Sequence, residues 1–162
     1  MSIHLHIDGL RGDSADARHQ GDIDVIQLAW GCRRRITARA STRYDRESAS
    51  AELQKLTFTK HMDRATPLLF IESCCGRGRT MTLELCRTGT GSGSEPYARY
   101  TLHHALLSDY HMAGWSEDEE RPLEKIKISF SKLEVAYMPH DDDNNPLPPI
   151  VVGFDARTNE RM

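Results

Sequence analysis

Apolar residues occupy every second position over much of this chain, and that spacing constrains its fold more than any other feature. A β-strand turns successive side chains to opposite faces, so this alternation predicts strands with one buried face. The predicted apolar faces are Ile3, Leu5 and Ile7; Ile26, Leu28, Trp30 and Cys32; Leu56 and Phe58; Met81, Leu83 and Leu85; Tyr100, Leu102 and Leu106; and a last strand covers Ile150–Asp155. Turns separate most of these segments, which favours antiparallel pairing. We predict a mainly β fold, an antiparallel β-barrel of two packed sheets, because closure removes exposed strand edges.

One long strand is expected from Leu123 to Met138, and its apolar phase changes midway. Apolar side chains fall on even positions up to Phe130 and on odd positions from Leu133 onward. A shift of one residue moves side chains to the other face unless an extra residue is inserted. The pattern therefore predicts a β-bulge near Ser131-Lys132.

A single short helix is expected after the third strand. Thr66 can cap through its hydroxyl, Pro67 suits the first helical position, and Gly76 can end the helix in a left-handed conformation. The helix is too short to be stable without packing. Its predicted buried stripe is Leu68, Ile71 and Cys75, with Leu69 beside them.

Charge is unevenly distributed along the chain. The formal net charge is −3, which gives no general attraction to nucleic acid. Residues 33–46 hold Arg33, Arg34, Arg35, Arg39, Arg43 and Arg46 against the single acid Asp45, and residues 36–49 read as an extended, exposed loop. Residues 117–120 and 141–143 are acidic. Such patches are either solvated loops or surfaces that pair between copies of the chain.

The cysteines and the N-terminal residues are informative about the cellular compartment in which the protein folds. Cys32, Cys74, Cys75 and Cys86 contain no CxxC pair, so we expect free buried thiols rather than a zinc or redox motif. The first ten residues lack the basic start and the continuous apolar stretch of a secretory signal. The apolar run at residues 68–71 is too short to span a bilayer, so we expect no membrane insertion.

Catalytic motifs are not recognisable. The sequence has no GxSxG, P-loop, HExxH or helix-opening GxGxxG pattern, so we expect no enzyme and no cofactor. His4 and His6 share one strand face and could chelate a metal, with a third ligand from His61 or His111. The alternative, which we favour, is that these are ordinary surface histidines. The run 141–145 is read as a solvated linker, because it lacks the ligand spacing of a calcium loop.

One segment carries a family resemblance. The residues Leu56-Thr57-Phe58-Thr59-Lys60-His61-Met62-Asp63-Arg64-Ala65-Thr66-Pro67-Leu68-Leu69 resemble the pattern L-x-F-x-K-x-x-D-x-[AS]-[ST]-P-x-L of the Hcp family, the haemolysin-coregulated proteins. Further segments agree in order: residues 3–12, 23–31, 97–110, 128–137 and 152–155. The resemblance therefore covers essentially the whole chain, residues 1–162, as a single tube-subunit domain.

The resemblance implies a structural role. Hcp proteins are subunits of the inner tube of type VI secretion systems. The family fold is a β-barrel flanked by one helix, and the subunits form hexameric rings that stack into a tube. The implied partners are other copies of the chain, effector proteins in the lumen, and the sheath, spike and baseplate components. The implied location is the bacterial cytoplasm during assembly, followed by secretion without a cleaved signal peptide.

The loop after the second strand departs from the family pattern. It is Gly-rich in many members, whereas residues 36–50 here contain no glycine. In the family this loop contributes to ring stacking, so our candidate stacking residues are Arg39, Arg43, Tyr44, Asp45 and Arg46. Their possible acidic partners on a neighbour are Glu117, Asp118, Glu119 and Glu120. Two other readings stay open at this point: a phage-type tail-tube subunit, and a monomeric ligand-binding β-barrel.

Overall fold

The computed structural model describes the chain except residues 37–41, 48, 89–92, 118 and 144. The described residues form the following elements: β1 (Ser2–Ile7), β2 (Ile23–Asp24), β3 (Gln27–Ala29), β4 (Cys32–Arg34), α1 (Arg43–Glu47), β5 (Ala51–Leu53), β6 (Leu56–His61), α2 (Thr66–Cys75), β7 (Arg79–Arg87), β8 (Glu95–Ala113), β9 (Leu123–Ser129), β10 (Lys132–Tyr137), β11 (Ile150–Asp155) and β12 (Glu160–Arg161). The fold is mainly β, as predicted.

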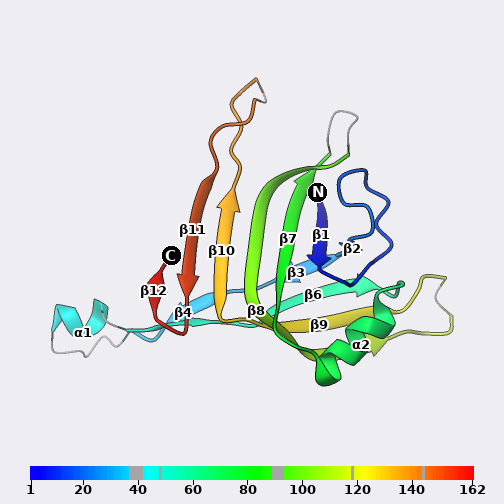
Figure 1. Cartoon of the computed structure of the whole chain (residues 1–162), viewed down its shortest axis with the longest axis horizontal. Coiled ribbons are helices and arrows are strands. Elements are labelled where there is room, and N and C mark those ends of the chain that lie inside the picture. Colours follow the sequence, from blue (N-terminus) through cyan, green and yellow to red (C-terminus); the bar gives the residue numbers. More distant parts are fainter. Residues whose placement is uncertain (37–41, 48, 89–92, 118, 144) are drawn as a thin grey trace.

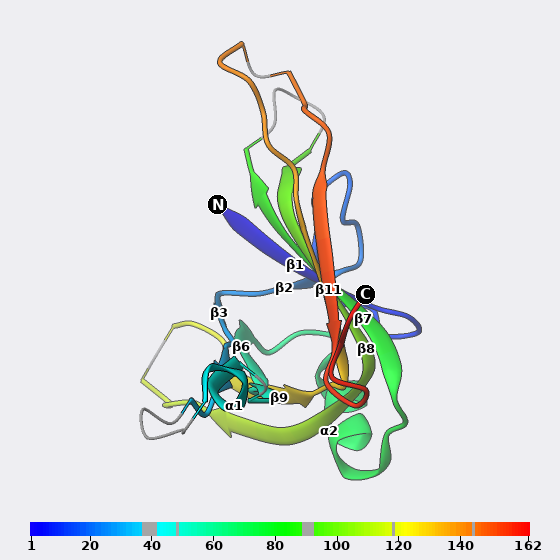
Figure 2. The ribbon, with the colours of Figure 1, turned by 90° about the vertical axis from the view of Figure 1, so that its left-hand side faces the viewer.

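Strand β8 joins two layers of antiparallel sheet (Figures 1 and 2). Its first half pairs with β7 and β10, in the layer ordered β12-β11-β10-β8-β7-β1-β2. Its second half pairs with β9, which continues through β6 to β3. His104 lies between the two halves with φ 52°, in the left-handed region that a non-glycine residue rarely adopts. This residue therefore marks the bend at which β8 leaves one layer for the other.

The core lies between the layers and confirms the alternation in several strands. Leu5, Leu83, Phe58, Ile126 and Leu102 are each fully buried, and they come from β1, β7, β6, β9 and β8. Truncating one such side chain to alanine removes apolar burial and leaves a cavity, at a cost of about 2–5 kcal/mol. The packing of these inward faces thus holds the layers together.

Two predicted strands are divided in the structure. The segment 123–138 is not one bulged strand: β9 lies in one layer and β10 in the other, so the change of phase marks a crossing between layers at Phe130-Ser131. The predicted second strand is three short strands, β2, β3 and β4, with partners β1, β6 and β5. The bend in β8 explains a further difference. Leu106 was predicted to face the core but is exposed, because the buried positions after the bend are Ala105 and Leu107.

The barrel is less closed than predicted. Among the described residues, no strand pairing joins β12 or β11 to β2 or β3, so the ends of the two layers stay open. The two packed layers and the flanking helix α2 nevertheless match the predicted fold class. Open ends leave unpaired backbone groups that another chain can bind.

Helix α2 forms where it was predicted, but its caps and its exposure differ. Ala65 is the N-cap residue, and the Asp63 carboxylate accepts the Ala65 N–H at 2.9 Å. Gly76 is extended, with φ −68° and ψ 166°, and is not left-handed. Of the predicted stripe only Leu69 is buried, whereas Leu68, Ile71 and Cys75 are exposed.

Candidate functional site

The arginine-rich segment projects from one end of the molecule (Figure 1). Strands β4 and β5 pair as a separate two-stranded sheet, and α1 lies beyond them at the far end. The predicted extended loop therefore includes a short helix at Arg43–Glu47, in which Arg43 and Tyr44 are exposed. Arg39 and the side chains of Asp45 and Arg46 lie outside the described part of the structure.

Several arginines of this projection have partners in their own chain. The Arg43 Nε donates to Glu47 Oε1 at 2.6 Å, and both side chains are exposed. The Arg33 Nε donates to Glu52 Oε2 at 2.9 Å, and this hydrogen bond holds the pKa of Glu52 below its usual value. Exposed pairs of this kind are worth about 0–1 kcal/mol, so they can exchange for partners on another subunit.

The acidic candidates lie at the other end of the molecule's long axis (Figure 1). Glu117, Glu119 and Glu120 are exposed in the connection between β8 and β9, and Asp118 is outside the described residues. Glu120 Oε2 lies 3.9 Å from His61 Nε2. Because α1 and this connection occupy opposite ends, one subunit does not bring the two predicted groups together.

Apolar side chains are exposed in two separate regions. On β11 the exposed residues are Ile150, Val151 and Val152, with exposed fractions of 62%, 57% and 44%. Of these three, Val152 lines an apolar hollow of about 280 Å³ together with Trp30 and Phe154. On α2, Leu68, Phe70 and Ile71 are 45%, 53% and 47% exposed. Clustered exposed apolar residues are typical of protein interaction surfaces.

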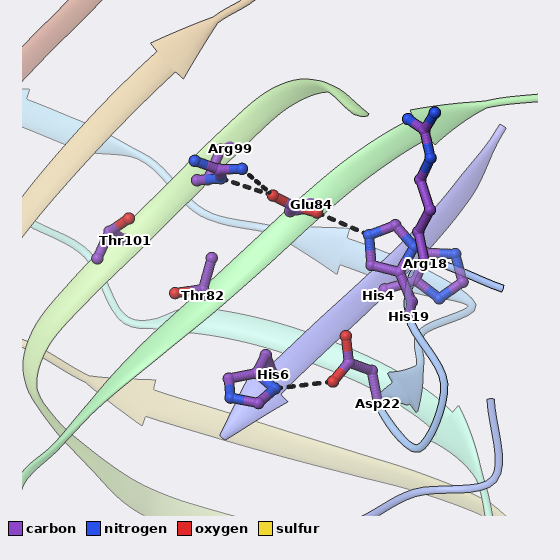
Figure 3. Close-up of a pocket in the computed structure, with 9 residues that line it drawn as sticks. All are labelled: His4, His6, Arg18, His19, Asp22, Thr82, Glu84, Arg99 and Thr101. Atoms are coloured by element: carbon purple, nitrogen blue, oxygen red, sulfur yellow. Dashed lines mark hydrogen bonds and ion pairs between the residues drawn. The ribbon is translucent and has the colours of Figure 1, made fainter. Parts of the chain in front are cut away.

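A polar hollow of about 370 Å³ lies over β1, β7 and β8 (Figure 3). The Arg99 Nε donates to Glu84 Oε1 at 2.6 Å, and Glu84 Oε2 lies 2.6 Å from His19 Nε2. His6 Nδ1 lies 2.8 Å from Asp22 Oδ1 and is exposed, whereas His4 is buried. The favoured expectation of ordinary surface histidines therefore holds for His6 but is wrong for His4, which stacks on His19, a residue that sequence reasoning missed.

The four cysteines are free thiols, as expected. Cys32, Cys74 and Cys75 are exposed, so the expectation of burial holds only for Cys86. Neither described helix has the length and apolar character needed to cross a bilayer.

Comparison with known proteins places this geometry in a family. A sequence model described as "Type VI secretion system effector, Hcp" matches residues 4–137. The chain belongs to the Hcp family. Protein hcp1 of Pseudomonas aeruginosa is 26% identical over 160 residues, which are 98% of this chain and 97% of that protein. A solved structure described as "Structure of a type six secretion system protein" superposes with a TM-score of 0.89 at 25% identity, covering 99% of both chains. Hcp1 from Salmonella typhimurium gives 0.78 at 23% identity over 99% and 98%, and shows the shared fold.

The segment that resembles Hcp proteins builds a buried charge network at the start of α2. Lys60 Nζ lies 2.6 Å from Glu124 Oε2 and 2.7 Å from Asp63 Oδ1, and Lys60 and Glu124 are fully buried. Thr66 Oγ1 donates to Glu124 Oε2 at 3.0 Å, and Tyr110 OH donates to Oε1 at 2.5 Å. Burial and this carboxylate raise the pKa of Tyr110. The lysine, aspartate and threonine of the Hcp pattern therefore fix the helix to β9, through a glutamate that sequence reasoning missed.

Proposed function

We propose that this chain is the tube subunit of a type VI secretion system and that it assembles into hexameric rings stacked into a tube. Membership of the Hcp family, matched over residues 4–137, carries the proposal. The role is structural rather than catalytic. The subunit supplies surfaces that fit other copies of itself.

The two exposed apolar regions support ring closure. A ring forms through a heterologous interface, in which two different surfaces of each subunit meet and the rotation closes. The β11 region and the α2 region are separate, which suits such an interface, and the open sheet ends offer further backbone pairing. Burying an exposed valine or isoleucine at an interface contributes up to about 1.5–3 kcal/mol.

The charged ends support ring stacking. The arginine-rich segment includes the exposed Arg43 on α1, and the connection before β9 includes the exposed Glu117, Glu119 and Glu120. Their positions at opposite ends of the subunit allow them to meet between copies. One exposed ion pair adds at most about 1 kcal/mol, so stacking depends on repetition of the contact around the ring.

The remaining partners follow from the same proposal. Effector proteins occupy the lumen, the sheath surrounds the tube, and spike and baseplate components meet its ends. The subunit is made in the bacterial cytoplasm and leaves the cell with the tube, without a cleaved signal peptide.

Negative-stain electron microscopy of the purified chain tests ring formation. We expect uniform annular particles, and side views of stacks at high protein concentration. Featureless particles of one-subunit size would contradict the proposal and favour the monomeric ligand-binding barrel. Rings encoded beside phage head and tape-measure genes, instead of sheath and ATPase genes, would identify a phage-type tail tube.

A further inference from the structure

Two histidines and a cysteine are buried together on the sheet face that lies opposite the core. In the β1–β7 pairing His4 faces Glu84 and Ser2 faces Cys86, so His4, Glu84 and Cys86 share this outer face. Residues 8–22 fold over it and bring in His19 (Figure 3). His4, His19 and Cys86 are 5%, 5% and 0% exposed. Each offers one ligand atom, and these atoms lie within 4.8 Å of one another.

Both imidazoles are held in the way that protein metal sites hold their ligands. Asp24 Oδ1 lies 3.0 Å from His4 Nδ1, and Asp16 Oδ1 lies 3.0 Å from His19 Nδ1. A carboxylate at Nδ1 keeps that nitrogen protonated and directs a metal to Nε2. His4 thus presents Nε2 to the site, whereas His19 Nε2 donates its proton to Glu84 Oε2 at 2.6 Å in the metal-free chain and must lose it when a metal binds. Asp16 is itself held by the backbone N–H groups of Arg18 and Ser94, at 3.0 and 2.8 Å.

The thiol and a carboxylate lie at ligand distance from His19. Cys86 Sγ is 3.8 Å from His19 Nε2, and bonds of 2.0–2.1 and 2.3 Å in a tetrahedral zinc site give a separation of about 3.6 Å. Glu84 Oε2 lies 2.6 Å from the same nitrogen. Burial disfavours the charged form of Glu84, but hydrogen bonds from His19 and Arg99 outweigh it and lower the pKa of its carboxyl. Glu84 is therefore an ionised oxygen donor beside the cluster.

We propose that His4, His19 and Cys86 bind a divalent transition metal of the zinc class, with Glu84 as the fourth ligand. Two imidazoles, one thiolate and one carboxylate are the donor set that zinc accepts in tetrahedral sites. The ion would join the 8–22 segment to β1 and β7 and so stabilise this edge of the sheet. The inference does not depend on ring formation.

Binding requires two local changes that the site allows. The His4 and His19 rings stack with centroids 4.2 Å apart and planes 7° from parallel, so one ring must rotate for both in-plane lone pairs to converge. The adjoining hollow of about 370 Å³ gives room and a path for the ion. Burial raises the pKa of the Cys86 thiol, so the metal must displace its proton. Binding therefore releases the protons of Cys86 Sγ and His19 Nε2 and weakens as the pH falls.

Titration of the chelator-treated, full-length protein with zinc and with cobalt(II) tests the site. We expect one ion per chain and a thiolate-to-cobalt charge-transfer absorption that Cys86→Ser abolishes. Asp24→Asn should weaken zinc about 10- to 100-fold, because it removes the support of His4 while Asp24 itself is largely exposed. His6→Asn is the matched control, since His6 lies on the same strand and face with Asp22 as its partner, and it should bind zinc as the unaltered chain does.

Several outcomes would overturn the proposal. Wild-type protein that takes up no zinc at micromolar concentration would show that the cluster is a hydrogen-bonded core group only. A charge-transfer band that survives Cys86→Ser but disappears in a Cys74→Ser, Cys75→Ser double variant would place the metal on α2. If Cys86→Ser fails to fold, the zinc affinity of Asp24→Asn is the deciding measurement. An affinity of Asp24→Asn equal to that of His6→Asn would contradict the site.

Discussion

Replacing Lys60 by methionine should destabilise this protein more than the loss of any exposed ion pair. The ammonium lies between two carboxylates, 2.6 Å from Glu124 and 2.7 Å from Asp63, and Lys60 and Glu124 have no exposed surface. Methionine keeps most of the volume but leaves the Glu124 charge buried without its cation. Breaking a buried pair in this way costs about 3–5 kcal/mol. At about 2–4 °C per kcal/mol for a chain of this length, the unfolding temperature should fall by about 6–20 °C.

Thermal denaturation followed by circular dichroism measures this effect. Oligomers are stabilised by mass action, so every variant must be compared at one protomer concentration and again after dilution. Lys127→Met is the matched control, because Lys127 lies on β9 and makes an exposed pair with Asp109 at 3.2 Å. The free energy of unfolding of this control should fall by less than about 1 kcal/mol.

A second substitution separates the charge from the packing. Glu124→Gln added to Lys60→Met removes the unpaired charge, so the double variant should recover part of the lost stability. The reasoning would be refuted if the free energy of unfolding of Lys60→Met lay within about 1 kcal/mol of that of the unaltered chain, as is expected for Lys127→Met.

Three further predictions concern the surface and the C-terminal strand. Reversing Arg39 and Arg43 to glutamate should weaken stacking, most of all in low salt, where the new repulsion from the acidic residues 117–120 is least screened; unchanged tube formation in low salt, seen by sedimentation, would count against the pairing. Val151→Asp should shift the particle mass toward single subunits in light scattering, because a charge enters an exposed apolar region; an unaltered mass would remove β11 from the interface. The hydrogen bond from Lys132 lowers the pKa of Asp155 below its usual 3.8, so its stabilisation is complete above that pH and is lost as the pH falls further. Asp155→Asn should therefore flatten the loss of stability below about pH 4, and an acid unfolding curve as steep as that of the unaltered chain would contradict this.

Local patterns in the sequence predict the parts of the fold that local rules determine. The alternation in β1, β6 and β7 identifies core residues such as Leu5, Phe58 and Leu83, which are fully buried. Pro67 locates the start of α2 because proline lacks the N–H that a first helical turn leaves unpaired. These assignments needed no knowledge of distant contacts.

The crossings between layers depend on distant partners and were not predictable locally. The change of phase near Phe130 has the same sequence pattern whether the strand bulges or changes sheets. Only the pairing of β9 with β6 and of β10 with β11 distinguishes the two. The left-handed conformation of His104 likewise follows from the path of β8 and has no residue signature.

Residues of the candidate sites were missed for a related reason. An apolar helix stripe looks the same whether it faces a core or another subunit, so the exposure of Leu68 and Ile71 could not be foreseen. Glu124 follows an acidic segment, and nothing in the sequence indicates its burial, which arises only when Lys60 of β6 and Thr66 of α2 lie against it. His19 lies in a polar loop, and only the folding of that loop over β1 brings it to His4 and Cys86.

Native mass spectrometry of the purified full-length chain measures the subunit number on which the tube proposal depends. The account predicts a dominant species of about six times the 18.4 kDa subunit mass, which persists on dilution to micromolar protomer. A dominant species of one subunit mass under those conditions would contradict it.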